Sequence, residues 1–227
     1  MNRVKAPSYL VRLSNVSKKY GNRFGLRDVS FAVEDHEVFG LMGPNGAGKS
    51  TLIRILATLT KPTNGEATIA GYNVTKQLHP VKRLIGVCLH QSLLYDELTG
   101  MENLSFYIRL YGCRDKETAK QLIVNAASLF GIEDRLEDPV GTLSSGLRKR
   151  LDIIRATIHS PRLLLLDEPL AGLDLQGLEY FKKFLKDARK KSAIIFSTHS
   201  LDVAEEISHR ICTLKEGQLA ELRYAKR

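Results

Sequence analysis

A glycine-rich run at Gly43–Thr51, with the sequence Gly-Pro-Asn-Gly-Ala-Gly-Lys-Ser-Thr, constrains the fold of this chain more than any other feature. It matches in full the phosphate-binding loop pattern of Gly, four residues and then Gly-Lys-Ser. Glycines let the backbone turn tightly, so that successive N–H groups point at one anion. Lys49 adds a positive charge for nucleotide phosphates, and the Ser50 hydroxyl is placed to ligate Mg²⁺.

The sequence on both sides supports a loop of this kind. Val38–Met42 is a short apolar run, typical of a buried strand, and Leu52–Ala57 continues as a helix. The N-terminus of that helix would face the phosphates. The alternative is a glycine-rich turn without a ligand, and the flanking strand and helix weigh against it.

Composition places the chain among ordinary globular proteins. Its 227 residues suffice for one large domain with a full core, and no apolar run reaches the 18 or so residues of a membrane span. Residues 1–12 contain no apolar segment of the kind found in signal peptides. The three cysteines are scattered and do not have metal or redox spacing, so we expect small core residues in a reducing cytosol. They are Cys88, Cys113 and Cys212.

The net charge is +9, from 34 Lys and Arg against 25 Asp and Glu. Such a balance fits a nucleic-acid surface, contact with an anionic membrane leaflet, or a well-solvated exterior. The positive residues are spread along the chain, with small clusters at 148–150 and 189–191, and no nucleic-acid-binding motif accompanies them. A solvated surface that attracts nucleotide is the favoured interpretation.

The first part of the chain alternates strands with turns. Residues 17–22 are expected to form a turn that carries an exposed aromatic, Tyr20. A second turn is expected at 61–65, and a short helix at 75–83. The expected strands are Tyr9–Leu13, Leu26–Val33, Glu66–Ile69 and Ile85–Leu89.

The later part changes character and then returns to the strand–helix rhythm. Three amphipathic helices are expected first, at Met101–Tyr111, Lys116–Phe130 and Gly146–His159. They are followed by strands at Leu163–Asp167 and Ala193–Ser197, helices at 174–190 and from Leu201, and a hairpin of Ile211–Leu214 with Gln218–Glu221. The pattern predicts an α/β fold: a P-loop NTPase (RecA-like) core with an N-terminal antiparallel β-subdomain and a helical insert. We expect one domain over 1–227, with subdivisions 1–91, 92–158 and 159–227.

Two acids follow the apolar strand at Leu163–Leu166. Running off a parallel strand, Asp167 would emerge beside the phosphate loop, where it can hold Mg²⁺ through water. Glu168 can accept a proton from, or orient, a water aimed at the γ-phosphate. Ordinary surface acids at a strand end are the alternative, which the phosphate loop makes less favourable.

An ordered set of motifs resembles the nucleotide-binding domain of ATP-binding-cassette (ABC) transporters over essentially the whole chain. After the phosphate loop come Gln91, Leu-Ser-Ser-Gly at 143–146, Leu-Leu-Leu-Leu-Asp-Glu-Pro at 163–169, Gly-Leu-Asp at 172–174 and Thr-His at 198–199. The phosphate loop alone occurs in many NTPases, whereas the ordered set is specific. The resemblance implies ATP and Mg²⁺ as ligands.

The resemblance also implies roles for single residues. Tyr20 would stack on adenine, and His199 would contact the γ-phosphate and orient the attacking water. Ser144, Ser145 and Gly146, at a helix N-terminus, would bind the γ-phosphate of ATP held by the opposite subunit. The implied ATP-binding loop residues are Gly43, Pro44, Asn45, Gly46, Ala47, Gly48, Lys49, Ser50 and Thr51. The implied catalytic residues are Lys49, Gln91, Glu168 and His199, the metal-site residues Ser50, Gln91 and Asp167, and the dimer-coupling residue Asp174. His90 lies near the site, but the resemblance gives it no role.

The chain departs from the family at the signature, whose usual form is Leu-Ser-Gly-Gly-Gln. Ser145 adds a Cβ where backbone approaches phosphate, and Leu147 removes a polar side chain at the helix start. Ser144 and Gly146 remain. Since Glu168 and His199 are also present, ATP hydrolysis is still expected.

The resemblance implies the ATP-hydrolysing subunit of an ABC exporter, working with a separate integral membrane subunit. We expect an ATP-sandwich dimer with itself or a paralogue, in the cytoplasm on the inner face of the cell membrane, and no nucleic-acid partner. Segments 59–65 and 94–104 look like ATPases of ABC-2 exporters, and 94–104 with 106–112 is similar to the haem-exporter ATPase of cytochrome c biogenesis. The alternative is a soluble ABC ATPase acting on nucleic acid or the ribosome. Such proteins usually carry two cassettes or a long coiled-coil insert, which this chain lacks.

Overall fold

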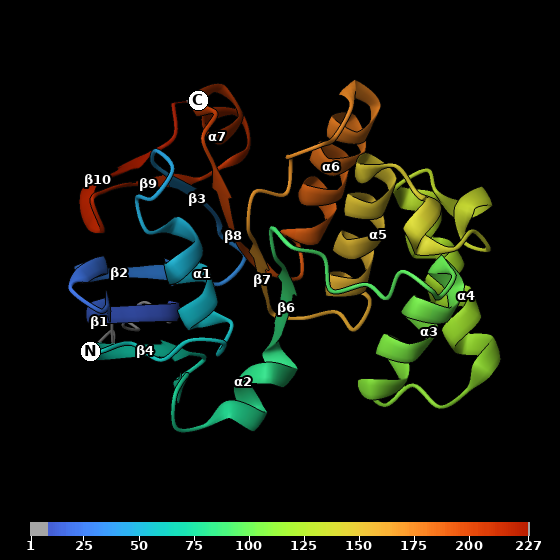
Figure 1. The fold of residues 1–227 in the computed structure, drawn as a ribbon, viewed down its shortest axis with the longest axis horizontal. Coiled ribbons are helices and arrows are strands. Elements are labelled where there is room, and N and C mark those ends of the chain that lie inside the picture. The colour runs from blue at the N-terminus through green and yellow to red at the C-terminus, as the bar shows by residue number, and fades with distance from the viewer. Residues whose placement is uncertain (1–8, 227) are drawn as a thin grey trace, which may run out of the picture.

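A computed structural model describes residues 9–226 and contains two β-sheets (Figure 1). The larger sheet has six strands in the order β10-β9-β3-β8-β7-β6, and the smaller has four in the order β2-β1-β4-β5. In the larger sheet β3, β6, β7, β8 and β9 run parallel, and β10 is an antiparallel edge strand. The predicted fold class is therefore confirmed.

The elements have the following bounds. The strands are β1 Tyr9–Tyr20, β2 Arg23–Glu34, β3 Val38–Met42, β4 Asn64–Ile69, β5 Tyr72–Asn73, β6 Ile85–Cys88, β7 Leu163–Leu166, β8 Ala193–Thr198, β9 Arg210–Lys215 and β10 Gln218–Tyr224. The helices are α1 Lys49–Leu56, α2 Leu78–Leu84, α3 Gly100–Leu110, α4 Lys116–Leu129, α5 Ser145–Thr157, α6 Leu175–Ala188 and α7 Leu201–Ile207, with short 3-10 turns η1 Glu133–Arg135 and η2 Val140–Thr142.

The larger sheet is buried on both faces, which explains why its strands are continuous apolar runs. In β7, Leu163 and Leu165 join one hydrophobic cluster, with α1 and the small sheet. Leu164 and Leu166 join a second cluster, with α5 and α6. Side chains of a strand alternate between faces, so one four-residue strand contributes to both clusters. Each buried leucine contributes about 1.5–3 kcal/mol relative to exposure.

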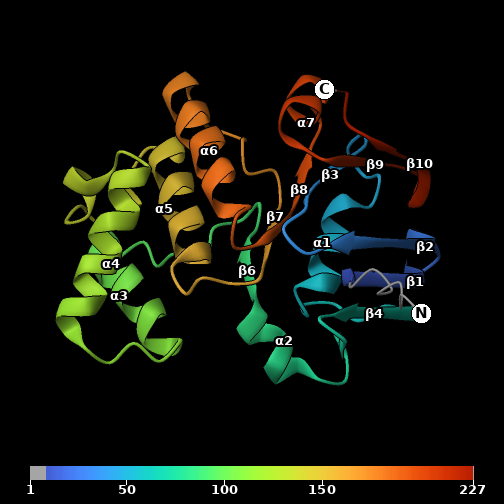
Figure 2. The same ribbon diagram turned by 180° about the vertical axis from the view of Figure 1, so that it is seen from behind.

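The helical insert lies at one end of the molecule. In both views α3 and α4 lie on the far side of α5 from the small sheet (Figures 1 and 2). The residue bounds of the three subdivisions stay a prediction. Within residues 9–226, no helix is both long enough and apolar enough to cross a bilayer.

The turn predicted at residues 17–22 is wrong. Strand β1 continues to Tyr20, whose partner in β2 is Arg23, so only two residues turn the hairpin. The hydroxyl of Ser17 donates to Asp28 Oδ1 (3.0 Å) and accepts from the Asp28 N–H (2.9 Å), which fastens this part of the pair. Backbone pairing across the hairpin therefore overrides the local turn signals. Shifts in the pairing register along β1 let the two strands stay paired through this segment.

Helix α2 begins at Leu78, three residues later than expected. The side chain of Asn73 accepts hydrogen bonds from the N–H groups of Thr75 and Lys76, which makes a turn there instead of a helical start. Cys88 and Cys212 are buried as expected, whereas Cys113, between α3 and α4, is only half-buried, so its prediction as a core residue is wrong.

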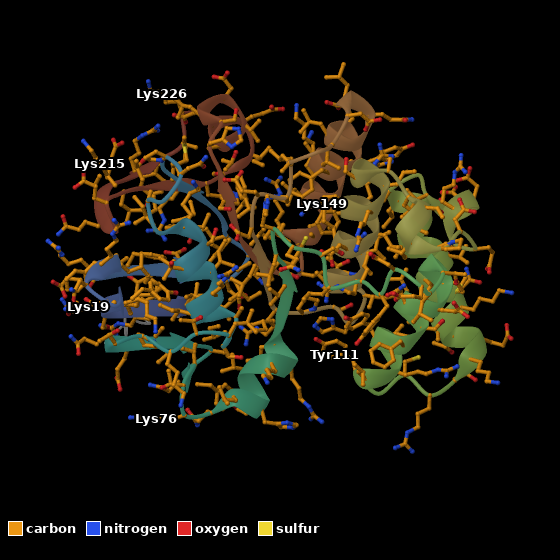
Figure 3. All side chains as sticks on the ribbon, viewed as in Figure 1. Lys19, Lys76, Tyr111, Lys149, Lys215 and Lys226 are labelled. Atoms are coloured by element: carbon orange, nitrogen blue, oxygen red, sulfur yellow. The ribbon has the colours of Figure 1, made fainter. Side chains whose placement is uncertain are left out.

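Several lysines are exposed on the side of the molecule that holds the smaller sheet and the β9–β10 hairpin. They are Lys19, Lys76, Lys215 and Lys226, which follow one another along that side in Figure 3. By contrast, Lys149 is buried. The interpretation of the net charge as a solvated exterior stays a prediction.

Candidate nucleotide site

The phosphate loop connects β3 to α1, and two of its glycines are required by space as well as by conformation. Gly43 and Gly48 have φ of 145° and 106°. A Cβ on Gly43 would lie 2.3 Å from the Leu214 carbonyl oxygen, and one on Gly48 2.4 Å from that of Gly25. Any side chain at either position would collide with backbone, so the loop can take this path only with glycine.

Lys49 is the first residue of α1, and its ammonium group lies over the loop. Its Nζ donates to the carbonyl oxygens of Gly43 (2.7 Å) and Pro44 (3.2 Å). The residue is 5% exposed. The loop thus holds a buried positive charge at its centre, where the phosphates of a nucleotide would lie.

Three neighbouring parallel strands, β3, β8 and β7, deliver their carboxyl ends to this place. Asp167 follows β7 directly, is 1% exposed, and accepts a hydrogen bond from Ser50 Oγ at 3.0 Å through Oδ1. The hydroxyl and the carboxylate predicted for the metal site are therefore in contact. Ligands of open α/β sheets bind at the carboxyl ends of the strands, as here.

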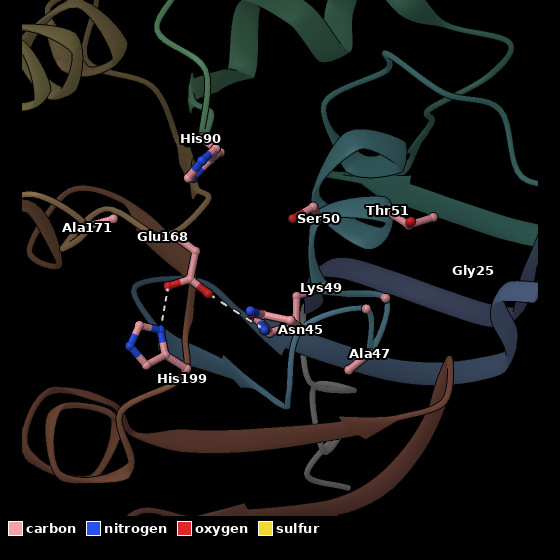
Figure 4. Close-up of a pocket in the computed structure, with 12 residues that line it drawn as sticks. Gly25, Asn45, Ala47, Lys49, Ser50, Thr51, His90, Glu168, Ala171 and His199 are labelled. Atoms are coloured by element: carbon pink, nitrogen blue, oxygen red, sulfur yellow. Dashed lines mark hydrogen bonds and ion pairs between the residues drawn. The ribbon is translucent and has the colours of Figure 1, made fainter.

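Glu168 lies between Lys49 and His199 (Figure 4). Its Oε1 is 3.6 Å from Lys49 Nζ, and its Oε2 is 3.2 Å from His199 Nδ1. The backbone of Glu168 has φ of 48°, in the left-handed region. For a residue with a Cβ this costs about 1–3 kcal/mol, and such strain clusters at functional sites.

A cleft of about 710 Å³ opens over these side chains (Figure 4). It is lined by Gly25, Asn45, Gly46, Ala47, Gly48, Lys49, Ser50, Thr51, His90, Glu168, Ala171 and His199. Most of these were predicted from the sequence; Gly25, His90 and Ala171 were not. The one signal for His90 was its position beside Gln91, and Gly25 reaches the cleft only because the β1–β2 hairpin folds over the loop.

Comparison with known proteins identifies the family. The model of the family described as "ABC transporter" matches residues 26–171. The chain belongs to the ABC transporter family. It is similar to the ABC transporter ATP-binding protein NatA of Bacillus subtilis (strain 168), with 34% identity over 216 residues, 92% of this chain and 87% of that one. It is also 32% identical to the linearmycin resistance ATP-binding protein LnrL of the same organism, over 92% of this chain and 68% of that one.

Solved structures agree with the sequence relatives. A dimeric post-hydrolysis state of the ATP-binding cassette MJ0796, bound to ADP and Pi, is 28% identical, with a TM-score of 0.89 and coverage of 96% of this chain and 99% of that one. CbiO1 of Clostridium perfringens, part of the ABC transporter complex cbiONQ, is 25% identical with a TM-score of 0.83, over 96% and 90%. The chain is an ABC-type ATP hydrolase and an ATP-binding subunit that energises transport. The comparisons give no support to the nucleic-acid alternative.

Besides the signature residues and Asp174, five predicted residues of this ABC cassette lie outside the cleft lining: Tyr20, Gly43, Pro44, Gln91 and Asp167. Gly43, Pro44 and Asp167 are hydrogen-bonded to Lys49 or Ser50, which line the cleft, so they lie directly behind it. Gln91 is exposed and lines a smaller hollow of about 360 Å³ with Ser145 and Lys149, so the structure does not bring it together with Ser50 and Asp167. Tyr20 is 48% exposed, and its ring is 3.0 Å from where a Cβ of Gly25 would stand. Tyr20 thus lies beside Gly25, one of the residues that line the cleft. The roles of Gln91 and Tyr20 stay predictions.

The signature turn of the cassette is engaged with its own chain. Ser144 is the N-cap of α5, and its Oγ accepts from the Leu147 N–H at 3.3 Å. A Cβ on Gly146 would lie 2.9 Å from the Gly172 carbonyl oxygen, so glycine is also needed for packing here. Leu147 packs against the second hydrophobic cluster, and Ser145 is exposed. None of these residues lines the cleft of the same chain.

Asp174 has two partners within the cassette. As the N-cap of α6, its Oδ1 accepts from the Gly177 N–H (2.8 Å) and from Arg150 Nη2 (2.5 Å). These hydrogen bonds hold the pKa of the Asp174 carboxyl below its usual value, and the bond from the Gly177 N–H makes the largest contribution. Because Arg150 belongs to α5, the predicted role of Asp174 in linking the two sites of a dimer would also involve α5.

One face of α5 is fastened to β6. Lys149 Nζ donates to the Leu89 carbonyl (3.2 Å) and Arg155 Nη2 to the Val87 carbonyl (2.5 Å). Between them, Asp152 is fully buried and accepts from Arg155 Nε (2.7 Å) and from the thiol of Cys88 (3.4 Å). Burial, reinforced by Asp152, raises the pKa of the Cys88 thiol far above its usual value. This thiol is therefore structural and not nucleophilic.

The residues present fit Mg²⁺ and a triphosphate. Ser50 Oγ and the Asp167 carboxylate are oxygen donors in mutual contact, which is the donor type that Mg²⁺ prefers together with phosphate oxygens. A glycine-rich loop with the buried Lys49 ammonium group against it fits the phosphates themselves. Bound between them, Mg²⁺ would neutralise negative charge on the β- and γ-phosphates.

Proposed function

We propose that this chain powers export by hydrolysing ATP in a dimer that is attached to a separate membrane-spanning subunit. The observation that carries the proposal is the meeting of a phosphate-binding lysine, a metal-site pair and a glutamate–histidine pair in one cleft, while the signature residues lie outside it. The lysine is Lys49, the metal-site pair is Ser50 with Asp167, and the third pair is Glu168 with His199. The signature residues outside the cleft are Ser144–Gly146.

Within one chain, the cleft residues divide the work of hydrolysis. Lys49 exchanges its loop carbonyls for phosphate oxygens and binds them as a point charge. The Glu168 carboxylate orients the attacking water and accepts its proton, while His199 holds Oε2 of that carboxylate in place. Catalysis of phosphoryl transfer is mostly positioning and electrostatic stabilisation, which a preformed set of this kind supplies.

The second half of the site comes from another copy or a paralogue. Ser144 and Ser145 are exposed at the N-terminus of α5, the helix end that favours anions. In a head-to-tail dimer this end would reach the γ-phosphate on the partner's loop. Support comes from the dimeric structures of the MJ0796 cassette. After hydrolysis the bridging charge is lost and the two protomers separate.

The membrane subunit is proposed to dock on α3. Phe106 and Leu110 are 43% and 66% exposed there, and they line a hollow of about 540 Å³ together with the apolar Met101 and the polar Glu102, Ser105 and Arg109. Exposed apolar side chains around a hollow are typical of interaction sites. Leu110→Glu should abolish copurification with the membrane subunit and leave the melting temperature unchanged. Retained copurification would move the docking site elsewhere.

Export is favoured over import by the resemblance of segments 59–65 and 94–104 to ABC-2 exporters, and haem is the narrower cargo proposal. The relative LnrL carries linearmycin resistance in its name, which is compatible with outward transport. The proposal places the chain in the cytoplasm, against the inner face of the membrane.

Isolation from native membranes tests this function. We expect the tagged chain to copurify with a polytopic membrane protein and the complex to hydrolyse ATP, with cargo moving outward in vesicles. Copurification with ribosomes or salt-sensitive binding to nucleic acid, and no membrane protein, would overturn it.

A further inference from the structure

Ser197 is the next-to-last residue of β8, and its hydroxyl lies between the two acids that follow β7. It is fully buried, on the face of β8 shared with Ala193 and Ile195, which belong to the first hydrophobic cluster. A hydroxyl at this depth needs hydrogen-bond partners. Both of its partners belong to the pair Asp167 and Glu168.

The direction of these two hydrogen bonds follows from the donors. The Glu168 N–H can only donate, and it donates to Ser197 Oγ at 2.8 Å. The hydroxyl proton is then left for Asp167 Oδ1, also at 2.8 Å. Ser197 therefore accepts from one residue and donates to the next, which alanine or valine cannot do and threonine can.

This arrangement answers a geometric problem of the site. Successive side chains of a strand point to opposite faces, so a strand continued through both acids would direct them apart. The left-handed φ of 48° at Glu168, two residues after β7 ends, turns the backbone so that Glu168 lines the cleft while Asp167 contacts Ser50. The bond from the Glu168 N–H to Ser197 Oγ holds the backbone in this strained conformation.

The same hydroxyl fixes Asp167. Its Oδ1 receives hydrogen bonds from Ser50 Oγ (3.0 Å) and Ser197 Oγ (2.8 Å), one from α1 and one from β8. Ser50 would turn toward Mg²⁺ on metal binding, whereas Ser197 is buried in the sheet and keeps its hold. Outer partners of this kind orient the groups that bind a metal.

We infer that Ser197 is a positioning residue for ATP hydrolysis, which sets the Glu168 backbone and the Asp167 carboxylate through one hydroxyl. Ser197 is buried and does not line the cleft, so it acts through the two acids. The inference rests on ATP hydrolysis and not on the direction of transport or the cargo.

Three variants of the full chain test this role. Ser197→Ala removes the hydroxyl, and Ser197→Thr keeps it. Ser192→Ala is the matched control. Ser192 is buried and immediately precedes the same strand, but its hydroxyl donates to the Pro161 carbonyl at 2.6 Å, at the end of the strand away from the carboxylates. The measurements are kcat and KM for Mg-ATP, the melting temperature, and the affinity for Mn²⁺ in the presence of ATP by electron paramagnetic resonance.

Ser197→Ala should lower kcat about 10- to 100-fold and weaken Mn²⁺ binding about tenfold, the range found for outer partners of metal and catalytic groups. KM for ATP should change less than about threefold, because the loop and Lys49 are intact. Ser192→Ala should lose a similar amount of melting temperature and keep wild-type kcat. Ser197→Thr should restore kcat and Mn²⁺ affinity to within about threefold of wild type.

Wild-type kcat and Mn²⁺ affinity in folded Ser197→Ala would overturn the inference, as would an equal loss in Ser192→Ala. A folded Ser197→Thr as impaired as Ser197→Ala would also overturn it, since the hydroxyl would then not be the acting group. If the wild-type chain binds Mn²⁺-ATP without hydrolysing it, ATP hydrolysis fails, and the Mn²⁺ affinities still decide the role of Ser197.

Discussion

The phosphate loop side and the signature turn of this cassette make opposite use of their polar groups. On the loop side Lys49, Asp167 and Ser197 are 5%, 1% and 0% exposed, and each is hydrogen-bonded to a residue in or directly behind the cleft. On the signature side Ser144 and Ser145 are exposed, and the hydroxyl of Ser144 caps its own helix. The loop side is preassembled inside the chain, whereas the signature side, which we propose as the second half of the site, is presented outward.

The difference shows how the work is divided. Buried polar networks are costly unless every member is satisfied, so the loop side is fixed before any ligand arrives. An exposed helix N-terminus gains little until an anion meets it. We therefore expect changes on the loop side to act on nucleotide chemistry and changes on the signature side to act on association.

The largest effect is expected at Glu168. Glu168→Gln keeps the size of the side chain but cannot accept the proton of water, so kcat should fall about 10²–10⁴-fold. Nucleotide binding should persist, and the protein should accumulate as an ATP-bound dimer, seen by size-exclusion chromatography with bound-nucleotide analysis. Unchanged phosphate release would remove Glu168 from the catalytic role.

Lys49→Ala should act on binding itself. Loss of charge-assisted hydrogen bonds to phosphate should raise the Kd for ATP about 10- to 100-fold, measured by isothermal titration calorimetry. Lys215→Ala removes an exposed lysine from the β9–β10 hairpin and serves as the control, with Kd unchanged. Wild-type affinity in Lys49→Ala would contradict the site.

A pair of variants at Ser144 separates capping from association. Ser144→Ala should cost about 1 kcal/mol of stability, seen as a melting temperature lower by about 2–4 °C, whereas Ser144→Asp keeps the cap. Both should lose ATP-dependent dimerisation in the Glu168→Gln background, because alanine lacks the hydroxyl and aspartate repels phosphate. If both still dimerise as the parent does, the signature residues do not reach the partner's nucleotide.

The smallest effect is a pH dependence at Asp174. Its folded-state pKa is depressed by the Gly177 N–H and then by Arg150, so it contributes stability above the ordinary carboxyl pKa of about 4 and loses it as pH falls through the lowered value. Asn caps a helix as well as Asp, so Asp174→Asn isolates the charge. The difference in melting temperature between wild type and Asp174→Asn should be present at pH 7 and shrink as the pH falls below the ordinary carboxyl pKa of about 4 and through the lowered pKa of Asp174. A difference that is constant with pH would contradict this.

Local signals sufficed where a segment makes its own structure. The loop at Gly43–Thr51 lies where the sequence placed it, and the strand predicted at Leu163–Asp167 is observed at Leu163–Leu166, because glycine positions and apolar runs act within a few residues. The turn expected at 17–22 failed, since Tyr20 pairs with Arg23 and Ser17 bonds to Asp28. No local pattern weighs backbone pairing along a whole hairpin.

The nucleotide site shows the same division. The sequence by itself determined the loop, the acids Asp167 and Glu168, and His199, because each belongs to a motif that is continuous in the chain. Only the tertiary structure decided that His90 and Gly25 line the cleft, that Gln91 does not, and that Ser197 joins the two acids from a strand about 30 residues away. Strand order in the sheet sets these neighbours, and hydrogen bonds between distant segments leave no trace in local periodicity.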